Sequence, residues 1–391
     1  MTAFHQIRLG EVLTLQRGFD ITKSEQFYGD VPIVSSSGVS SYHNKWKVKG
    51  PGVIIGRKGT LGTVHFIRSN YWPHDTTLWI KDFKGNDPRF LSYFLQTLKL
   101  ENFDVGASNP TLNRNHVHKI RVIFPKTLET QKRIAATLSA YDELIESQNR
   151  RIALLEKLAV EIYREWFVRF RFPGYKNAKF IKGIPANWRI KPFGKIVNFK
   201  MGQSPPSESY NEAGDGLPFH QGVGTYGSRF PQRVMYCNTN GRKAEKGDIL
   251  FSVRAPVGRL NIADCEMIIG RGLSAMCHRE GHNSYLFYLL KVVFAHEDII
   301  GNGSIFNSLG KDELEKFQVL QPDDELVVQF QSTTATIDRQ IEILSQSVEK
   351  LTRTQDMLLP RLISGKLSVE NLDIHFPPGM AEESKTETAD A

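Results

Sequence analysis

Two long stretches without glycine or proline constrain the fold of this chain more than any other feature. Residues 126–172 lie between Pro125 and Pro173, and residues 323–359 lie between Pro322 and Pro360. Helices end at or near prolines, so each stretch is predicted to form one uninterrupted helix. Alternating spacings of four and three residues place mostly apolar side chains on one stripe of each helix. Such a heptad seam requires a partner helix.

The two seams are related by a constant offset of 196 residues (330 − 134 through 358 − 162). The predicted seam positions are Ile134, Leu138, Tyr141, Ile145, Ile152, Leu155 and Ile162 in the first helix, and Phe330, Ile337, Ile341, Leu344, Val348, Leu351 and Leu358 in the second. A shared offset over so many positions indicates an internal duplication. A globular block must fit between the end of one helix and the start of the other. We therefore predict that the two helices pair as an antiparallel coiled coil.

The globular blocks that precede the helices repeat as well. Residues 9–18 parallel 193–202, and the strand-like runs 52–56 and 247–253 occupy matching places. Both blocks mix short strand patterns with turn signals, and each carries a helical pattern late in the block. The predicted fold class is α+β, with two mixed α/β blocks alternating with two long helices in an internal pseudo-twofold repeat. The predicted segments are 1–125, 126–172, 173–322, 323–370 and an acidic tail, 371–391, expected to be disordered.

The net charge of +8 over 391 residues is unevenly distributed. Residues 1–125 carry +7 (16 Lys and Arg against 9 Asp and Glu), and residues 172–322 carry +6 (19 against 13). Two basic blocks suggest two separate contacts with a polyanion. No stretch approaches the roughly 18 apolar residues of a membrane helix, and the N-terminus does not resemble a signal peptide. With three cysteines and no disulfide framework, we expect a cytoplasmic protein without a membrane partner.

Several catalytic motifs are absent from the sequence. The run from Gly56 to Thr60 has the wrong spacing for a phosphate-binding loop, and Asn109-Pro110-Thr111-Leu112 lacks the second proline and the aromatic residue of an adenine-methylating motif. Cys277, His278 and His282 have no second ligand pair at zinc-finger spacing. We therefore predict no catalytic residues, no bound cofactor and no metal site.

A set of short motifs, in a fixed order, resembles the specificity subunit of type I DNA restriction-modification enzymes over residues 5–370. The motifs are LETQKRI at 128–134, IALLEKL at 152–158, KGDILFSVRAPVG at 246–258, IGRGLS at 269–274 and LLPRLISGKL at 358–367. The first block departs from the pattern, because it has RKGTLG at 57–62 where the second has VRAPVG at 253–258. This difference indicates that the two blocks prefer different DNA half-sites.

The resemblance implies a non-catalytic subunit that binds double-stranded DNA in a sequence-specific way. Its two target recognition domains would each read one half of a bipartite site, and its helices would set the spacing between the halves. The helices would also dock modification (methyltransferase) subunits, two in number, which methylate adenine with S-adenosylmethionine. Restriction (translocase) subunits that use ATP and magnesium would join the complex. Two alternatives remain open: a single-chain DNA-modifying enzyme with an unrecognised site, and a coiled-coil scaffold that does not touch DNA.

Candidate DNA-contacting residues are polar or basic side chains in glycine-containing loops, because such groups can hydrogen-bond to base edges or phosphates. They are Ser35, Ser36, Ser37, Arg57, Lys58, Thr60, Asn109 and Arg114 in the first block, and Gln203, Ser204, Gln221, Tyr226, Arg229, Arg254, Arg271, Ser274, Ser304 and Asn307 in the second. Polar residues beside glycine are also common turn formers, so a structural role is the alternative at each position.

Overall fold

The computed structural model describes residues 4–103, 111–294, 299–300, 304–305, 308–370, 372–374 and 376. The chain divides into two compact units. Unit 1 consists of Met1–Gln148 and Gln346–Ala391, and unit 2 consists of Asn149–Ser345. Each unit therefore contains one globular domain together with part of both long helices, whereas the sequence predicts consecutive blocks and helices. The predicted acidic tail lies almost entirely outside the described residues.

Both predicted long helices are present, with ends that differ from the flanking prolines. Helix α4 spans Leu128–Tyr163 and continues as one π-helical segment, Arg164–Val168, while α7 spans Asp324–Ile363. The π-helical segment ends the first helix before Pro173, and Phe170 leaves the helical conformation with a φ of 56°. Pro360, expected to end the second helix, lies inside α7 instead. Proline has no backbone N–H, so one intrahelical hydrogen bond is missing at this position, in the last turn of the helix.

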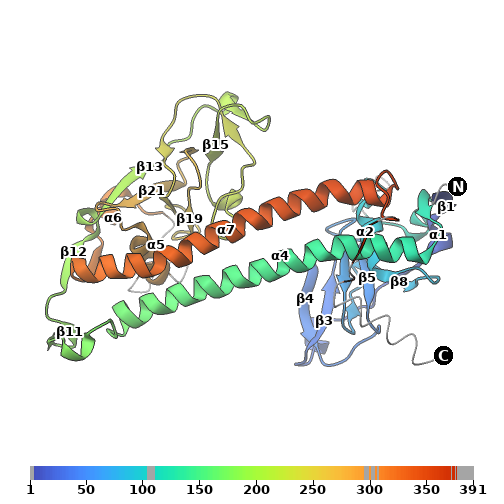
Figure 1. Cartoon of the computed structure of the whole chain (residues 1–391), viewed down its shortest axis with the longest axis horizontal. Helices are drawn as coiled ribbons and strands as arrows, with labels where there is room; N and C mark the ends of the chain where they lie inside the picture. Colours follow the sequence, from blue (N-terminus) through green and yellow to red (C-terminus); the bar gives the residue numbers. More distant parts are fainter. Residues whose placement is uncertain are drawn as a thin grey trace. The chain divides into compact units, whose positions relative to one another are not determined.

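The two long helices run antiparallel to each other within each unit (Figure 1). In unit 1, Gln355 of α7 donates from Nε2 to the Leu138 carbonyl of α4 at 3.1 Å. In unit 2, the ring of Phe330 near the start of α7 lies 5.7 Å from the ring of Tyr163 near the end of α4. Every predicted seam side chain is buried or partly buried. The predicted pairing of the two helices thus agrees with the contacts in both units.

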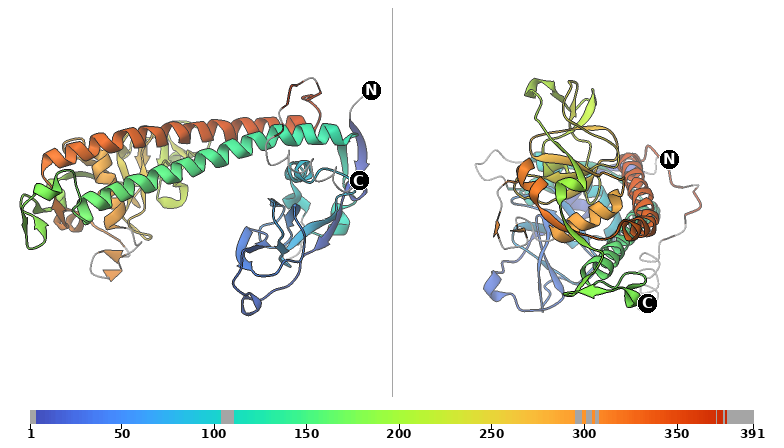
Figure 2. Two further views of the ribbon diagram at one scale, coloured as in Figure 1. Left: turned by 60° about the horizontal axis from the view of Figure 1, so that its bottom comes forward. Right: turned by 90° about the vertical axis from the view of Figure 1, so that its left-hand side faces the viewer.

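The globular domain of unit 1 contains a four-stranded antiparallel sheet, a smaller three-stranded sheet and a strand pair (Figure 2). Their strands, in sheet order, are β2 (Thr14–Arg17), β8 (Thr77–Asp82), β5 (Gly52–Gly56) and β6 (Val64–Ile67); β4 (Gly38–His43), β3 (Val31–Ser35) and β7 (Trp72–Pro73); and β1 (Phe4–Arg8) with β9 (Arg121–Pro125). The helices are α1 (Leu9–Val12), α2 (Pro88–Gln96) and α3 (Arg114–Val117). Helix α2 begins where the Asp87 side chain accepts a hydrogen bond from Phe90 N at 2.6 Å.

The globular domain of unit 2 repeats this arrangement with a larger second sheet. Its strands, in sheet order, are β13 (Val197–Met201), β21 (Leu273–His278), β18 (Ile249–Ser252) and β19 (Leu260–Ile262); β14 (Tyr210–Asn211), β16 (Tyr236–Cys237), β15 (Leu217–His220), β20 (Met267–Ile269) and β17 (Lys243–Ala244); and β12 (Arg189–Pro192) with β24 (Gln318–Gln321). Two further pairs are β10 (Phe180–Ile181) with β11 (Ile184–Pro185) and β22 (Ile299–Ile300) with β23 (Ser304–Ile305). The helices are α5 (Asn283–Val293) and α6 (Lys311–Lys316).

Each unit has a core that joins the main sheet, the domain helix and the long helices. In unit 1, Val53 of β5 and Phe94 of α2 belong to one buried cluster with Ile134 of α4 and Leu362 of α7. In unit 2, Phe330 of α7 lies at the centre of a larger aromatic cluster with α4 and α5. The seam positions Ile134 and Phe330, which are 196 residues apart, thus anchor a domain on the helices in both units.

Candidate nucleic-acid interface

Three loops of unit 1 converge at one end of its main sheet. They are the β5–β6 turn, the β3–β4 turn and the segment between β7 and β8. The backbone N–H groups of Arg57 and Lys58 donate to the Thr76 carbonyl at 2.8 and 3.0 Å. Ser36 N donates to Thr76 Oγ1 at 3.4 Å, and Thr63 Oγ1 donates to the Ser36 carbonyl at 2.5 Å. The structure therefore brings together predicted residues from both turns.

The remaining predicted residues of unit 1 lie in or beside these loops. Ser35 Oγ lies 3.1 Å from Ser37 Oγ, and Thr60 lies in the β5–β6 turn, where its carbonyl accepts from Thr63. Arg114 begins α3, two residues after Leu112, whose N–H donates to the Arg57 carbonyl at 3.0 Å. Its exposed side chain is therefore attached close to Arg57. Asn109 lies outside the described residues.

Unit 1 also contributes charged residues to this cluster that the sequence analysis missed. Asp75 forms an ion pair with Arg17 at 2.8 Å, and its carbonyl accepts from Arg57 Nη1 at 3.4 Å. His74 Nδ1 lies 3.1 Å from the Asp75 carboxylate. Burial, together with the nearby positive charge of Arg17, lowers the pKa of Arg57. Within the described part of the chain, Lys58 forms no ion pair.

Equivalent loops converge in unit 2. Ser204 Oγ lies 3.0 Å from Gln221 Oε1 and 2.8 Å from Gln221 Nε2, and Arg271 N donates to Ser204 Oγ at 3.4 Å. Gln203 N donates to the Ile269 carbonyl at 3.0 Å, which holds the segment after β13 beside the end of β20. Arg254 lies in the neighbouring β18–β19 turn and is exposed, as is Arg271. The structure therefore gathers five of the predicted residues of the second block at one place.

The hydrogen bonds show that the two clusters are related by the internal repeat. Arg57 N donates to Thr76 O at 2.8 Å in unit 1, and Val253 N donates to Gly272 O at 2.9 Å in unit 2. The two donors are 196 residues apart, and so are the two acceptors. By the same offset, Lys58 corresponds to Arg254, and Asp75 corresponds to Arg271. Asp75 could therefore have been found from the sequence, because it lies 196 residues before the candidate Arg271.

A glycine closes the loop after β5 in unit 1 and the loop after β18 in unit 2, where the N–H groups of Gly62 and Gly258 donate to the Gly56 and Ser252 carbonyls. Gly62 and Gly258 lie 196 residues apart and have φ values of 73° and 88°. Both values lie in the left-handed region of backbone conformation, which is energetically unfavourable for residues other than glycine. The residues that precede these glycines differ, KGTL in unit 1 and RAPV in unit 2. The backbone of the two loops differs as well, because Gly59 has a φ of 77° in unit 1, whereas the Ala255–Pro256 peptide bond is cis in unit 2.

Three predicted residues of unit 2 do not join the cluster, which corrects the expectation that they contact DNA. Arg229 is 2% exposed and forms an ion pair with Asp338 at 2.5 Å inside the unit. Ser274 is completely buried within β21. The Tyr226 hydroxyl is buried, and this burial raises the pKa of the phenol. For Ser304 only the backbone is described, in β23, and Asn307 lies outside the described residues.

Two groups of side chains come close enough to suggest a metal ion. His278, Glu280 and His282 form one group, in which His278 Nδ1 already accepts from Glu280 N at 3.2 Å. Burial lowers the pKa of His278 to about 4. The other group contains Asp20, His74 and Asp75, but the Asp75 carboxylate is paired with Arg17. Each group thus contains a ligand atom that already has an internal partner, His278 Nδ1 in one and the Asp75 carboxylate in the other, and we assign no metal site to either.

Comparison with known proteins shows the family of this chain. The family model described as the type I restriction modification DNA specificity domain matches residues 1–157 and again residues 185–353. The chain therefore belongs to the family of type I restriction-modification specificity subunits, and the two matches coincide with the two halves of the internal repeat.

Individual relatives agree with this assignment. A Methanocaldococcus jannaschii protein named as the MjaX type I restriction enzyme specificity subunit is 32% identical over 295 residues, covering 73% of this chain and 69% of the relative. The MjaIX specificity subunit of the same organism is 24% identical over 304 residues, covering 72% of this chain and 70% of the relative. The crystal structure of a type I restriction-modification S subunit from M. genitalium has the same fold. It matches with a TM-score of 0.61 and 18% identity, over 92% of this chain and 96% of that one.

Among the described residues, no helix has the length and apolar character of a membrane span.

Proposed function

We propose that this chain is the DNA-reading subunit of a type I restriction-modification complex and is not itself a catalyst. Each globular domain is a target recognition domain that binds one half of a bipartite site in double-stranded DNA. The observation that carries this proposal is the loop cluster built twice, once in each unit, on equivalent backbone hydrogen bonds. Each copy presents a cation at the same position of its turn, Lys58 in unit 1 and Arg254 in unit 2. Cations in such loops neutralise phosphates, and the neighbouring polar side chains can reach base edges.

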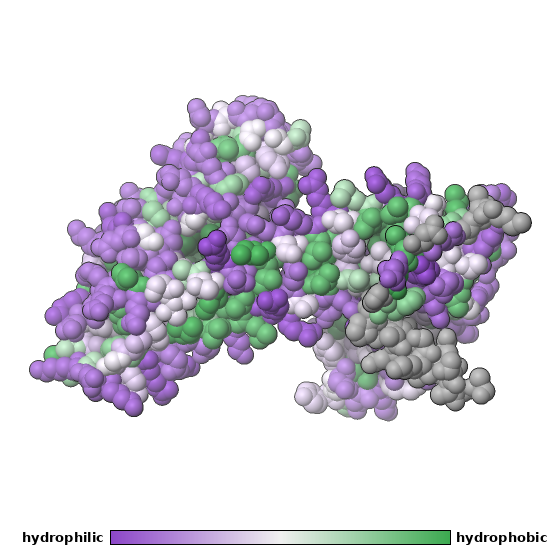
Figure 3. Space-filling view, in the orientation of Figure 1, coloured by the Kyte–Doolittle hydropathy of each residue, from purple (hydrophilic) through white to green (hydrophobic). Residues whose placement is uncertain are grey.

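The paired helices provide the frame on which the two recognition domains are mounted, and we propose that this frame sets the gap between half-sites. It also offers apolar surface for partner subunits. In unit 2, Leu154 and Leu158 lie one turn apart on α4 and are 61% and 51% exposed, and Ile343 of α7 is 50% exposed. Figure 3 shows hydrophobic surface over this part of the helices. An exposed apolar patch on a paired helix favours docking of another protein.

The partners that we propose are two modification subunits, which methylate adenine using S-adenosylmethionine, and restriction subunits, which use ATP and magnesium to translocate DNA. All cofactors then belong to these partners. We place the complex in the cytoplasm, where the three free cysteines remain reduced. The family assignment favours this function over a single-chain DNA enzyme or a scaffold that never binds DNA.

Methylome sequencing tests this proposal. A host that expresses the chain with its modification subunit is expected to carry methylated adenine in a bipartite motif, and a host with the modification subunit alone is not. Replacing residues 1–125 with the corresponding block of another family member should change one half of the motif and leave the other half intact. Methylation or cleavage by the isolated chain would contradict the proposal, as would a motif whose two halves both change on this exchange.

A further inference from the structure

Unit 1 contains a polar cluster where the domain helix α2 meets the long helices, in which Arg89 is buried and the Asp142 carboxylate is partly exposed. Asp142 of α4 accepts from Arg89 Nη2 at 3.2 Å and from the Tyr93 hydroxyl, both on α2. Gln355 of α7 donates from Nε2 to the second Asp142 oxygen at 2.6 Å. These four residues are called joint 1. Through them, the recognition domain of unit 1 is hydrogen-bonded to a carboxylate of α4 that α7 also contacts.

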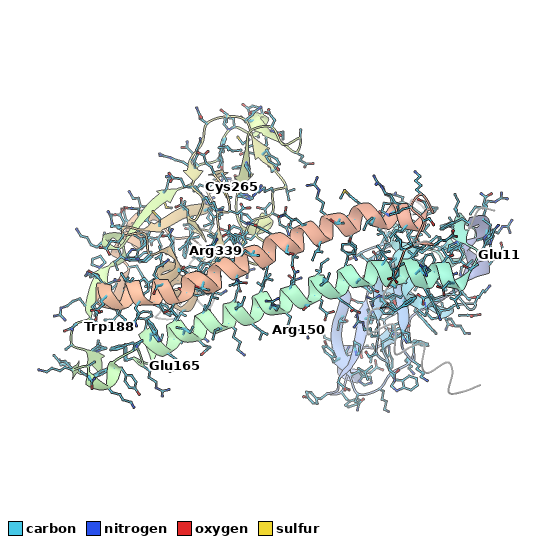
Figure 4. All side chains as sticks on the ribbon, in the orientation of Figure 1. Glu11, Arg150, Glu165, Trp188, Cys265 and Arg339 are labelled. Carbon is cyan, nitrogen blue, oxygen red and sulfur yellow. The ribbon has the colours of Figure 1, made fainter. Side chains whose placement is uncertain are left out.

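Unit 2 contains a corresponding cluster. Asp338 of α7 accepts at Oδ1 from Arg229 Nη2 at 2.5 Å and from the Tyr288 hydroxyl of α5 at 2.6 Å. Glu156 of α4 lies 3.6 Å from Arg229 Nη1. Arg229, Tyr288, Asp338 and Glu156 are called joint 2. Figure 4 labels Arg339, which follows Asp338 on the stretch of α7 beside this domain.

The two joints share a chemistry that duplication alone does not explain. Asp142 and Asp338 are 196 residues apart and occupy repeat positions, and Tyr93 and Tyr288 lie on the corresponding domain helices α2 and α5. The arginines do not, because Arg89 lies on α2, whereas Arg229 comes from the loop between β15 and β16. Two unrelated segments thus supply a guanidinium to equivalent carboxylates. This convergence indicates that each domain needs a charged, hydrogen-bonded contact at this point.

The joints provide directional contacts that the apolar core lacks. Apolar burial holds a domain on a helix without specifying its angle, whereas hydrogen bonds and ion pairs between the domain and the helices are directional and favour one geometry. Arg89 is 8% exposed and Arg229 is 2% exposed, so a rotation that broke either ion pair would leave a buried charge without its partner. Burial also raises the pKa of Tyr93 and Tyr288, which keeps both phenols protonated as donors.

We propose that joints 1 and 2 act as positioning residues that hold each recognition domain at one angle on the helices and thereby restrict the complex to one gap length. This inference rests on the proposed function, because gap length has meaning only for a bipartite reader. One added base pair displaces a half-site by about 3.4 Å along the DNA axis. A domain that can tilt would accept such a displaced half-site without any change in the bases that it reads.

Gap tolerance in the complete complex tests the proposal for unit 2. Asp338→Asn keeps the shape of the side chain and removes its charge, Tyr288→Phe removes one donor, and Asp338→Glu keeps the charge. A cavity of about 510 Å³ beside Asp338 leaves room for the longer side chain of the last variant. Glu325→Gln, at an exposed position of α7, is the matched control. Each complex is assayed for methylation of duplexes that carry the native gap or a gap one base pair longer or shorter.

We expect Asp338→Asn and Tyr288→Phe to raise methylation at the altered gaps about tenfold relative to the native gap, which corresponds to a loss of about 1.4 kcal/mol of orienting free energy. The half-site bases stay unchanged, and Asp338→Glu and Glu325→Gln retain wild-type gap selectivity. If Asp338→Asn fails to fold, Tyr288→Phe decides the outcome. Wild-type gap selectivity in a folded Tyr288→Phe complex overturns the proposal, as does a change of half-site bases.

A measurement without DNA separates this inference from the proposed function. Hydrogen exchange of the α5 amides in the full chain should be faster in Asp338→Asn and Tyr288→Phe than in wild type and Glu325→Gln. If the wild-type complex methylates no bipartite site, the proposed function fails, while the exchange data still report on the joint. Unchanged exchange of α5 in both joint variants would show that the joint does not hold the domain.

Discussion

Replacing Phe330 with alanine should destabilise unit 2 while leaving unit 1 largely unaffected. The Phe330 side chain is completely buried, and its ring lies 5.1 Å from Phe167, 5.7 Å from Tyr163 and 5.7 Å from Trp166. These three rings come from the end of α4 and the segment after it. Alanine would leave a cavity between α4, α5 and α7 that the surrounding rings cannot fill without leaving their own positions.

The expected loss follows from the size of this cavity. Truncating a buried phenylalanine to alanine costs about 3–5 kcal/mol, and a site surrounded by rigid rings belongs in the upper part of that range. A loss of about 4 kcal/mol with an m-value of about 2 kcal/mol/M moves a urea midpoint down by about 2 M. The matched variant in unit 1 is Ile134→Ala, at the equivalent repeat position and 1% exposed. Val328→Ala, on an exposed position of α7, is the surface control.

Urea unfolding can be followed for each unit separately. The tryptophans of unit 2 are Trp166 and Trp188, whereas unit 1 contains Trp46, Trp72 and Trp79. Replacing all the tryptophans of one unit by phenylalanine leaves only the other unit's reporters, so each fluorescence transition can be assigned to a unit. Phe330→Ala should lower the unit 2 transition alone, and Ile134→Ala the unit 1 transition alone. The reasoning is refuted if Phe330→Ala shifts the unit 2 midpoint by less than about 0.5 M, or if both variants shift both transitions equally.

Three further predictions concern binding, pH dependence and the end of the chain. Lys58→Ala and Arg254→Ala should each weaken DNA binding and reduce the slope of log affinity against log salt by about 0.9, measured by titration over a salt series; an unchanged slope would exclude phosphate contact. Burial lowers the pKa of His220 and of His278 to about 4, so both stay neutral in the folded unit while the unfolded chain takes up protons below its ordinary pKa of about 6.5. Unit 2 should therefore lose about 1.4 kcal/mol per pH unit for each histidine as the pH falls from about 6.5 towards 4, as read from urea midpoints, and a flat profile would contradict this. Val369 is 2% exposed and belongs to the core of unit 1. Replacing it with serine should lower the free energy of unfolding of unit 1 by about 1.5–3 kcal/mol and leave the unit 2 transition unchanged.

The local loop contacts explain why candidate DNA residues were only partly predictable. Arg57, Lys58 and Arg254 lie in turns that glycines mark in the sequence, and the structure places them as turn residues at the sheet ends. Arg229 has the same appearance, a basic residue next to glycine and serine, yet it is buried against Asp338. The two residues are 109 positions apart, and no periodic pattern links a loop arginine to a helix carboxylate at that separation.

The sequence by itself determined the architecture. Absence of glycine and proline, together with the heptad spacing, was sufficient for two long helices, because helix formation depends on neighbours three and four residues apart. The 196-residue offset was sufficient for the duplication and for the pairing of equivalent positions such as Ile134 and Phe330.

Only the tertiary structure decided how side chains from distant segments combine. It placed Asp75 and Arg17 beside Arg57, and it turned Arg229 inward to a joint whose counterpart in unit 1 uses Arg89. The physical reason is that burial and ion pairing depend on which segments meet in space, and different segments of the two halves supply the same charge. The repeat in the sequence therefore defines equivalent backbone positions, while the folded units define which side chains gather in the loop clusters and which are buried between a domain and the long helices.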